Sequence, residues 1–75
     1  METTRTRAEH VRWCKQRARE YLQQGNTAEA VTSMLSDLGK HPETERLAGA
    51  MAMLGLFTIG RSPGEAQDFI EGFAE

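Results

Sequence analysis

The sequence predicts an all-α protein: one small domain of four helices over residues 1–75, with residues 1–5 expected to be flexible. Two observations lead to this prediction. Apolar residues recur at spacings of three and four, the period of a helix that buries one face. Residues that cap helices stand just before three of these segments. No segment alternates between polar and apolar residues as a half-buried strand does, and a chain this short has room for one core.

The first helix is expected to begin near Arg7 and to end near Gln24. Thr6 is followed three residues later by Glu9, a capping box in which each side chain accepts the backbone N–H of the other residue. Gly25 then tolerates the left-handed conformation found after many helix ends. The apolar side chains of the segment form one stripe: Val11, Cys14, Ala18, Tyr21 and Leu22.

The second helix follows almost at once. Asn26 and Glu29 repeat the capping pattern, and Gly39 and Pro42 end the segment. Its apolar face consists of Ala30, Val31, Met34, Leu35 and Leu38. Because the connection is so short, the first two helices are expected to form an antiparallel hairpin with facing apolar stripes.

The third helix is expected from Thr44 to about Phe57, buried at the centre of the fold or of a dimer. Its large side chains fall on two sides: Leu47, Met51, Leu54 and Phe57 on one, Met53 and Leu56 on the other. A helix that is apolar on two faces needs two neighbours. Gly49 and Gly55 each weaken it by about 1 kcal/mol relative to alanine, a cost that often accompanies close helix approach.

A short fourth helix is expected to close the fold. Ser62 and Glu65 have the spacing of a third capping box, and Pro63 stands at the first helical position, where its missing N–H costs nothing. Ala66, Phe69, Ile70 and Phe73 form its apolar stripe.

The composition argues against secreted and membrane proteins. The single cysteine, Cys14, cannot form an intramolecular disulfide, which favours a reducing compartment. Residues 1–12 lack the apolar run of a secretory signal. The most apolar stretch, residues 47–59, is shorter than the roughly 18 to 20 residues that cross a bilayer. We therefore expect a cytoplasmic protein without membrane association.

Charge is unevenly distributed along the chain. Residues 1–24 hold six Lys or Arg and three Glu, whereas the rest holds three Lys or Arg and eight Asp or Glu. The simpler interpretation is a basic first helix packed beside acidic later ones. The alternative is a basic face on which Arg5, Arg12 and Arg19 bind phosphates, as in a nucleic-acid accessory factor. No DNA-reading motif accompanies this stripe and the net charge is −2, so nucleic acid is the less favoured partner.

The residues that could carry chemistry are too few or too scattered for a catalytic or metal site. His10 and Cys14 are helix neighbours, but zinc needs three or four protein ligands and His41 is the only other His or Cys. Cys14 lies on an apolar stripe and is expected to be a small buried hydrophobe. The eleven carboxylates are spread mostly over polar helix faces, as solvated charges are. We expect no enzyme activity, no cofactor and no metal.

Trp13 lies about 140° from the apolar centre of the first helix, at 100° per residue, so the hairpin alone would leave it exposed. Two interpretations are open. The fourth helix, the chain ends or a stacked Arg17 could cover the ring, or Trp13 could be a binding hot spot flanked by His10 and Arg17. Met53 and Leu56 are candidates for a second, adaptable contact surface.

Residues 11–42 resemble a single tetratricopeptide repeat, a helical hairpin. The signature positions are held by Cys14, Arg17, Ala18, Tyr21, Ala30, Met34 and Pro42. Tyr21, Ala30 and Pro42 match the signature, whereas Cys14 and Arg17 depart from it. The pattern is not repeated later, and about three copies are needed to form a groove. The resemblance therefore implies a repeat-like hairpin and not a repeat array.

The chain also looks like small proteins of unassigned function from actinobacterial phages and prophages. The resemblance rests on Trp13-Cys14-Lys15, Arg17-Ala18, Tyr21-Leu22, Ser33-Met34-Leu35-Ser36-Asp37-Leu38, Lys40-His41-Pro42-Glu43-Thr44 and Phe69-Ile70-Glu71-Gly72-Phe73. It implies expression in the host bacterial cytoplasm, where such proteins act by binding a host or phage protein. The leading hypothesis is therefore a non-enzymatic protein–protein interaction module. The alternatives are a homo-oligomer joined through the third helix, such as a homodimer, and the nucleic-acid accessory factor.

Overall fold

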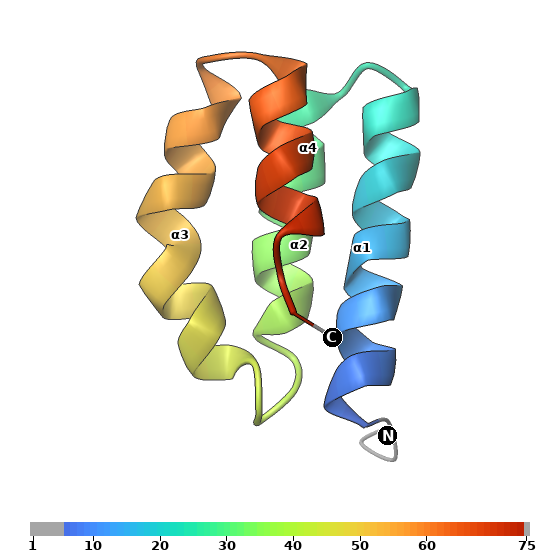
Figure 1. Ribbon diagram of the computed structural model, residues 1–75, viewed down its shortest axis with the longest axis vertical. Helices are drawn as coiled ribbons and strands as arrows, with labels where there is room; N and C mark the ends of the chain where they lie inside the picture. The colour runs from blue at the N-terminus through green and yellow to red at the C-terminus, as the bar shows by residue number, and fades with distance from the viewer. Residues whose placement is uncertain (1–5, 75) are drawn as a thin grey trace.

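The computed structural model describes residues 6–74 and shows an all-α bundle, as predicted. Its four helices are α1 (Arg7–Gln23), α2 (Thr27–Leu38), α3 (Glu45–Ile59) and α4 (Pro63–Glu71). Successive helices run antiparallel, with α1 and α3 on opposite sides and α2 and α4 between them (Figure 1). Within the described residues α1 and α3 do not contact each other. The expected flexibility of residues 1–5 concerns a segment outside this range.

Three helices begin at the capping residues that the sequence predicts. The Thr6 hydroxyl accepts the Glu9 backbone N–H at 3.1 Å, and the Glu9 carboxylate accepts the Thr6 N–H at 2.9 Å, which completes a capping box. Asn26 and Ser62 each accept the N–H three residues further on. Each cap satisfies a backbone donor that the helix itself leaves unpaired and contributes about 1 kcal/mol.

The turn from α1 to α2 is a Schellman motif. Gly25 has a φ of 76°, which a residue with a Cβ rarely adopts. Its N–H donates to the Leu22 carbonyl, and the Asn26 N–H donates to the Tyr21 carbonyl. This tight turn sets α2 directly beside α1, so the predicted hairpin forms.

The turn from α2 to α3 is fixed by a buried threonine. The Thr44 hydroxyl donates to the Leu38 carbonyl at the end of α2, and its side chain does not cap α3, which begins one residue later. His41 is buried in the same turn and accepts the Glu43 N–H on Nδ1 at 3.1 Å. The turn is therefore an ordered part of the core.

The core follows the apolar stripes of α1, α2 and α4. Its buried members are Val11, Cys14, Ala18, Ala30, Met34, Leu38, Ala48, Ile70 and Phe73. Only one of these residues, Ala48, comes from α3. The stripes predicted for the other three segments are confirmed, because their central residues are the ones that lose contact with water.

The expectation that the third helix is buried at the centre of the fold is wrong: α3 packs on the body through its small residues. Ala48 and Gly55 are its only buried positions. A Cβ added at Gly55 would lie 2.8 Å from the Phe69 ring and 3.2 Å from the Leu35 side chain. Neighbouring side chains thus fill the space that a larger residue would take, and most of the large side chains of α3 point away from the body.

Candidate partner-binding surfaces

The outer face of α3 exposes four large apolar side chains. Relative to their full surface, Met53 is 82% exposed, Phe57 63%, and Leu54 and Leu56 57% each. The sequence pattern placed Leu54 and Phe57 on one side of the helix and Met53 and Leu56 on the other, with a neighbour expected on each side. The structure instead brings all four to the solvent side. Most large apolar side chains of globular domains are buried, so a contiguous exposed group of this kind is a candidate contact surface.

Three of these residues, Met53, Leu56 and Phe57, belong to a stripe that runs along the helix. Arg46, Gly49, Ala50, Met53, Leu56, Phe57 and Gly60 are all exposed and are spaced by three and four. We call this set the α3 stripe. Between Arg46 and Arg61 the chain carries no charged residue. The α3 stripe therefore begins with a cation, Arg46, and is uncharged from there to Gly60.

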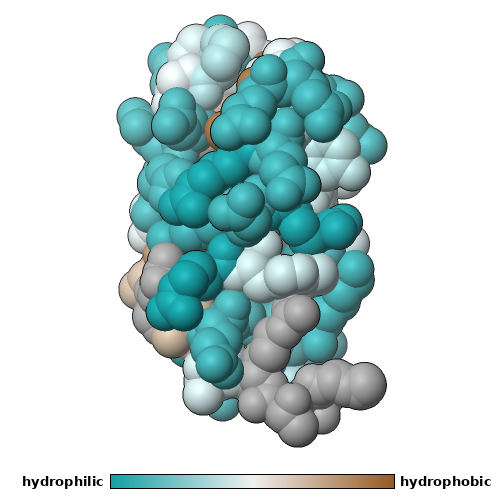
Figure 2. Space-filling model, turned by 90° about the vertical axis from the view of Figure 1, so that its right-hand side faces the viewer, coloured by the Kyte–Doolittle hydropathy of each residue, from teal (hydrophilic) through white to brown (hydrophobic). Residues whose placement is uncertain are grey.

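The α1 side of the molecule has the opposite character. Viewed on that side, the surface is almost entirely hydrophilic (Figure 2). The exposed side chains of α1 include Arg12, Gln16, Glu20 and Gln23. Among the described residues, the large apolar side chains that are exposed all lie on α3.

Trp13 is half-buried under two cations. The Arg17 guanidinium lies 5.1 Å from the centre of the indole ring, and the Lys40 ammonium lies 5.8 Å from it. The His10 ring is tilted against the indole at 5.6 Å between centroids. Of the covers expected from the sequence, Arg17 is present; Lys40, from the turn after α2, was not foreseen.

A buried carboxylate holds these cations in place. Asp37 is 1% exposed and accepts from Arg17 Nε at 2.7 Å and from Lys40 Nζ at 3.0 Å. Ser33 donates to the same carboxylate at 3.3 Å. The hydrogen bond to Asp37, together with the negative charge of Asp37, raises the pKa of the Arg17 guanidinium above its usual value. The expectation that carboxylates lie on solvated faces is therefore wrong for Asp37.

His10 and His41 are buried next to each other, with ring centroids 5.0 Å apart. His10 Nε2 lies 2.7 Å from the Asp37 carbonyl oxygen, and because a carbonyl only accepts, this nitrogen carries the proton. Cys14 is buried too. Over residues 6–74, no group of three or more His, Cys, Asp or Glu side chains could hold a metal ion. His10 thus joins α1 to α2 through its hydrogen bond to Asp37, and to the turn after α2 through its ring contact with His41.

The basic stripe of α1 is partly neutralised. Arg5 lies outside the described residues, and Arg12 is exposed. Arg19 makes two 2.7 Å hydrogen bonds to the Glu71 carboxylate. These bonds hold the pKa of Glu71 below its usual value, with the charges of Arg19 and Lys15 acting in the same direction and burial opposing them. The simpler interpretation of the charge asymmetry, a basic helix paired with acidic neighbours, is the one that the structure shows.

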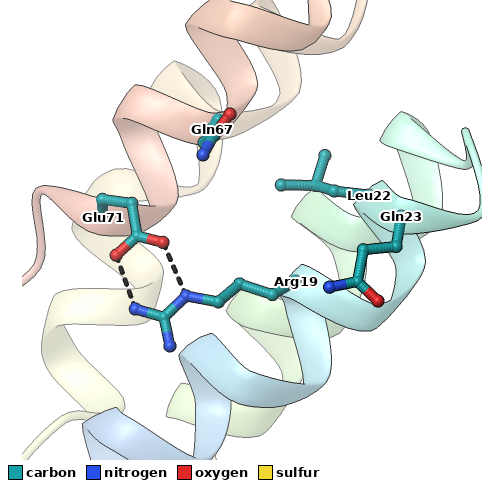
Figure 3. A pocket seen from close by; sticks show the side chains of 5 residues that line it. All are labelled: Arg19, Leu22, Gln23, Gln67 and Glu71. Carbon is teal, nitrogen blue, oxygen red and sulfur yellow. Dashed lines mark hydrogen bonds and ion pairs between the residues drawn. The ribbon is translucent and has the colours of Figure 1, made fainter.

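The Arg19–Glu71 pair spans a cleft of about 320 Å³ between α1 and α4 (Figure 3). Leu22 and Gln23 line the α1 wall and Gln67 the α4 wall. Its two charged groups satisfy each other, so neither is held ready for a substrate.

A second, more apolar hollow of about 200 Å³ lies where α3 meets α4. It is lined by Met51, Asp68, Phe69, Gly72 and Phe73. Phe69 and Phe73 meet edge to face, with centroids 5.2 Å apart. The Phe69 ring in turn packs against α3 at Gly55.

Comparison with known proteins assigns no family: no family model matches the chain, and neither a curated protein nor a solved structure is significantly similar to it. Among the helices of residues 6–74, none is both long and apolar enough to span a bilayer. The interpretation of the site therefore depends on its geometry.

Proposed function

We propose that the protein is a non-enzymatic interaction module that binds another protein through the α3 stripe. The observation that carries the proposal is the exposure of Met53, Leu54, Leu56 and Phe57 on one helix. Removing a side chain of this size from water is worth about 1.5–3 kcal/mol. A partner that covers Met53 and Leu56 alone would gain a substantial part of the binding free energy of a complex with a micromolar dissociation constant.

The other predicted contact residues are better suited to support the fold. His10 is buried, and Arg17 and Trp13 contact each other while Arg17 is held by Asp37. A partner that captured Trp13 would have to displace these contacts. The α3 stripe offers apolar surface without that cost, and for this reason we assign Met53 and Leu56 as the principal contacts.

The kind of partner follows from the resemblance noted in the sequence. If the chain is one of the small phage proteins that it resembles, its partner is a host or phage protein in the bacterial cytoplasm. Methionine favours such a role, because its flexible thioether adapts to differently shaped partner surfaces.

The proposal is tested by affinity purification of the tagged chain from its native host, with an untagged copy co-expressed. The test variant is Met53→Glu with Leu56→Glu. The control is Gln16→Glu with Ala28→Glu, which adds the same charge at exposed positions of α1 and α2. We expect at least one protein to be recovered with the wild type and the control but lost with the α3 variant. Recovery of the same proteins by all three, or of none by the wild type, contradicts the proposal.

A further inference from the structure

We propose that the protein bound by the α3 stripe is a second copy of this chain, packed antiparallel about a two-fold axis at Met53. This inference rests on the proposed function and names the partner. It follows from the order of small and large residues along the α3 stripe and from the cation Arg46 at its start.

The two halves of the α3 stripe differ in size. Gly49 and Ala50 precede Met53, and Leu56 and Phe57 follow it at nearly equal separation. A Cβ added at Gly49 would meet no atom within 4 Å, so the backbone there is open to a neighbour. The first half is thus a shallow hollow and the second half a ridge.

An antiparallel two-fold fits each ridge into the hollow of the other copy. In a symmetric dimer every contact occurs twice, with residue i of one copy against residue j of the other and the reverse. With the axis at Met53, Phe57 of one copy lies over Gly49 of the other, and Leu56 lies over Ala50. A parallel pair would instead set Phe57 against Phe57 and leave Gly49 facing Gly49, which combines a collision with a void.

The charges at the ends of the helix pair do not oppose this axis. Arg61, which follows α3, is paired within its own copy, with its Nε 2.6 Å from Glu65 Oε1. Its guanidinium also lies 5.5 Å from the centre of the Phe57 ring of the same copy. Arg46 approaches the carbonyl end of the other α3, whose own last turn carries no basic residue. A cation at this end of a helix is stabilised by the helix dipole.

The contact is small, which determines how strong the association is expected to be. The 15 residues of α3 span about 22 Å at 1.5 Å per residue. One helix pair of this length lies at or below the lower end of the roughly 1,200–2,000 Å² of standard stable interfaces. We therefore expect a reversible dimer whose population rises with concentration.

The test is sedimentation equilibrium of the purified chain from micromolar to millimolar concentration, with Gly49→Leu, Phe57→Ala and the double variant. Gly49→Leu places a leucine against Phe57 of the other copy, so two large side chains meet. Phe57→Ala places an alanine against Gly49 of the other copy, so two small residues meet. We expect each single variant to weaken dimerisation at least tenfold and the double variant, which again opposes large with small, to recover most of the loss. Circular dichroism establishes that each variant keeps its helices.

Three outcomes overturn the inference: a chain that is monomeric at every concentration, a dimer that neither single variant weakens, and a double variant no better than the weaker single one. The first of these leaves the proposed function intact if purification from the host still recovers a different protein in an α3-dependent manner. If nothing is recovered through α3 either, both proposals fail.

Discussion

Asp37 organises the contacts that cover Trp13. Its carboxylate accepts from three side chains, and its backbone carbonyl accepts from His10. Arg17 and Lys40 are at once ion partners of Asp37 and neighbours of the indole ring. The position of both cations over Trp13 is thus set by one buried group.

We expect Asp37→Ala to lower the free energy of unfolding by about 2–3 kcal/mol, since it removes hydrogen bonds to charged groups from a buried site. Arg17 and Lys40 are partly exposed and can regain water, which keeps the loss below that of a fully buried pair. Urea denaturation measures the loss, and a change in the Trp13 emission spectrum of the folded protein should accompany it.

The matched control for this prediction is Asp68→Ala, because Asp68 is an exposed carboxylate on α4. Substitutions at exposed positions usually change the free energy of unfolding by less than about 0.5 kcal/mol. Equal losses from the two substitutions would show that burial of Asp37 contributes nothing.

The sequence could predict that Trp13 needs a cover, but not what the cover is. Arg17 is one helical turn away, so its stacking follows from spacing. Lys40 is 27 residues away and reaches the ring because it is held by Asp37. Asp37 was missed because helix periodicity cannot show that two distant cations will surround a buried carboxylate.

At the level of the helices, prediction succeeded where a segment has one apolar face. The caps at Thr6, Asn26 and Ser62 predict where three helices begin, since capping is local chemistry. For α3 it failed, because a helix with apolar residues all round carries no signal for which side is buried. Side-chain size was also misleading: the small residues Ala48 and Gly55 face the body.

The two central glycines of α3 should respond in opposite ways to alanine. At Gly49 an added methyl group meets nothing, so we expect Gly49→Ala to raise the free energy of unfolding by up to about 1 kcal/mol through helix propensity. At Gly55 the methyl group would collide with Phe69, so we expect Gly55→Ala to lower it by about 1–3 kcal/mol. Thermal unfolding in dilute solution, where the monomer dominates, compares them.

Because both substitutions add the same methyl group to the same helix, each serves as the control for the other. Equal stabilisation by the two would mean that Phe69 does not approach α3 as described. Destabilisation by Gly49→Ala would mean that its outer surface is not open in the monomer.

The molecule as a whole has two outer sides of opposite character. α1 presents a hydrophilic surface and α3 an apolar one, and α2 and α4 keep the two helices apart (Figures 1 and 2). α4 links both sides. Lys15 and Arg19 bind Glu71 at its end, and Phe69 packs into the space over Gly55. How firmly α4 is held to α1 therefore affects one of the two supports of α3, the other being α2.

This dependence predicts a loss of stability in acid. The pKa of Glu71 is lower in the folded protein than its usual value, so its carboxylate stabilises the fold above that usual value. The contribution is lost as the pH falls through the folded-state pKa. Because the side chains of Arg19 and Glu71 are 40% and 36% exposed, we expect it to be about 0.5–1 kcal/mol and weaker at high salt. Thermal unfolding of Glu71→Gln should therefore differ from that of the wild type at neutral pH and converge with it in acid.

The control is Gln67→Ala in the same cleft, where any effect should be independent of pH because no charge is removed. A Glu71→Gln difference that persists undiminished in acid would show that Glu71 holds α4 through packing and not through its charge.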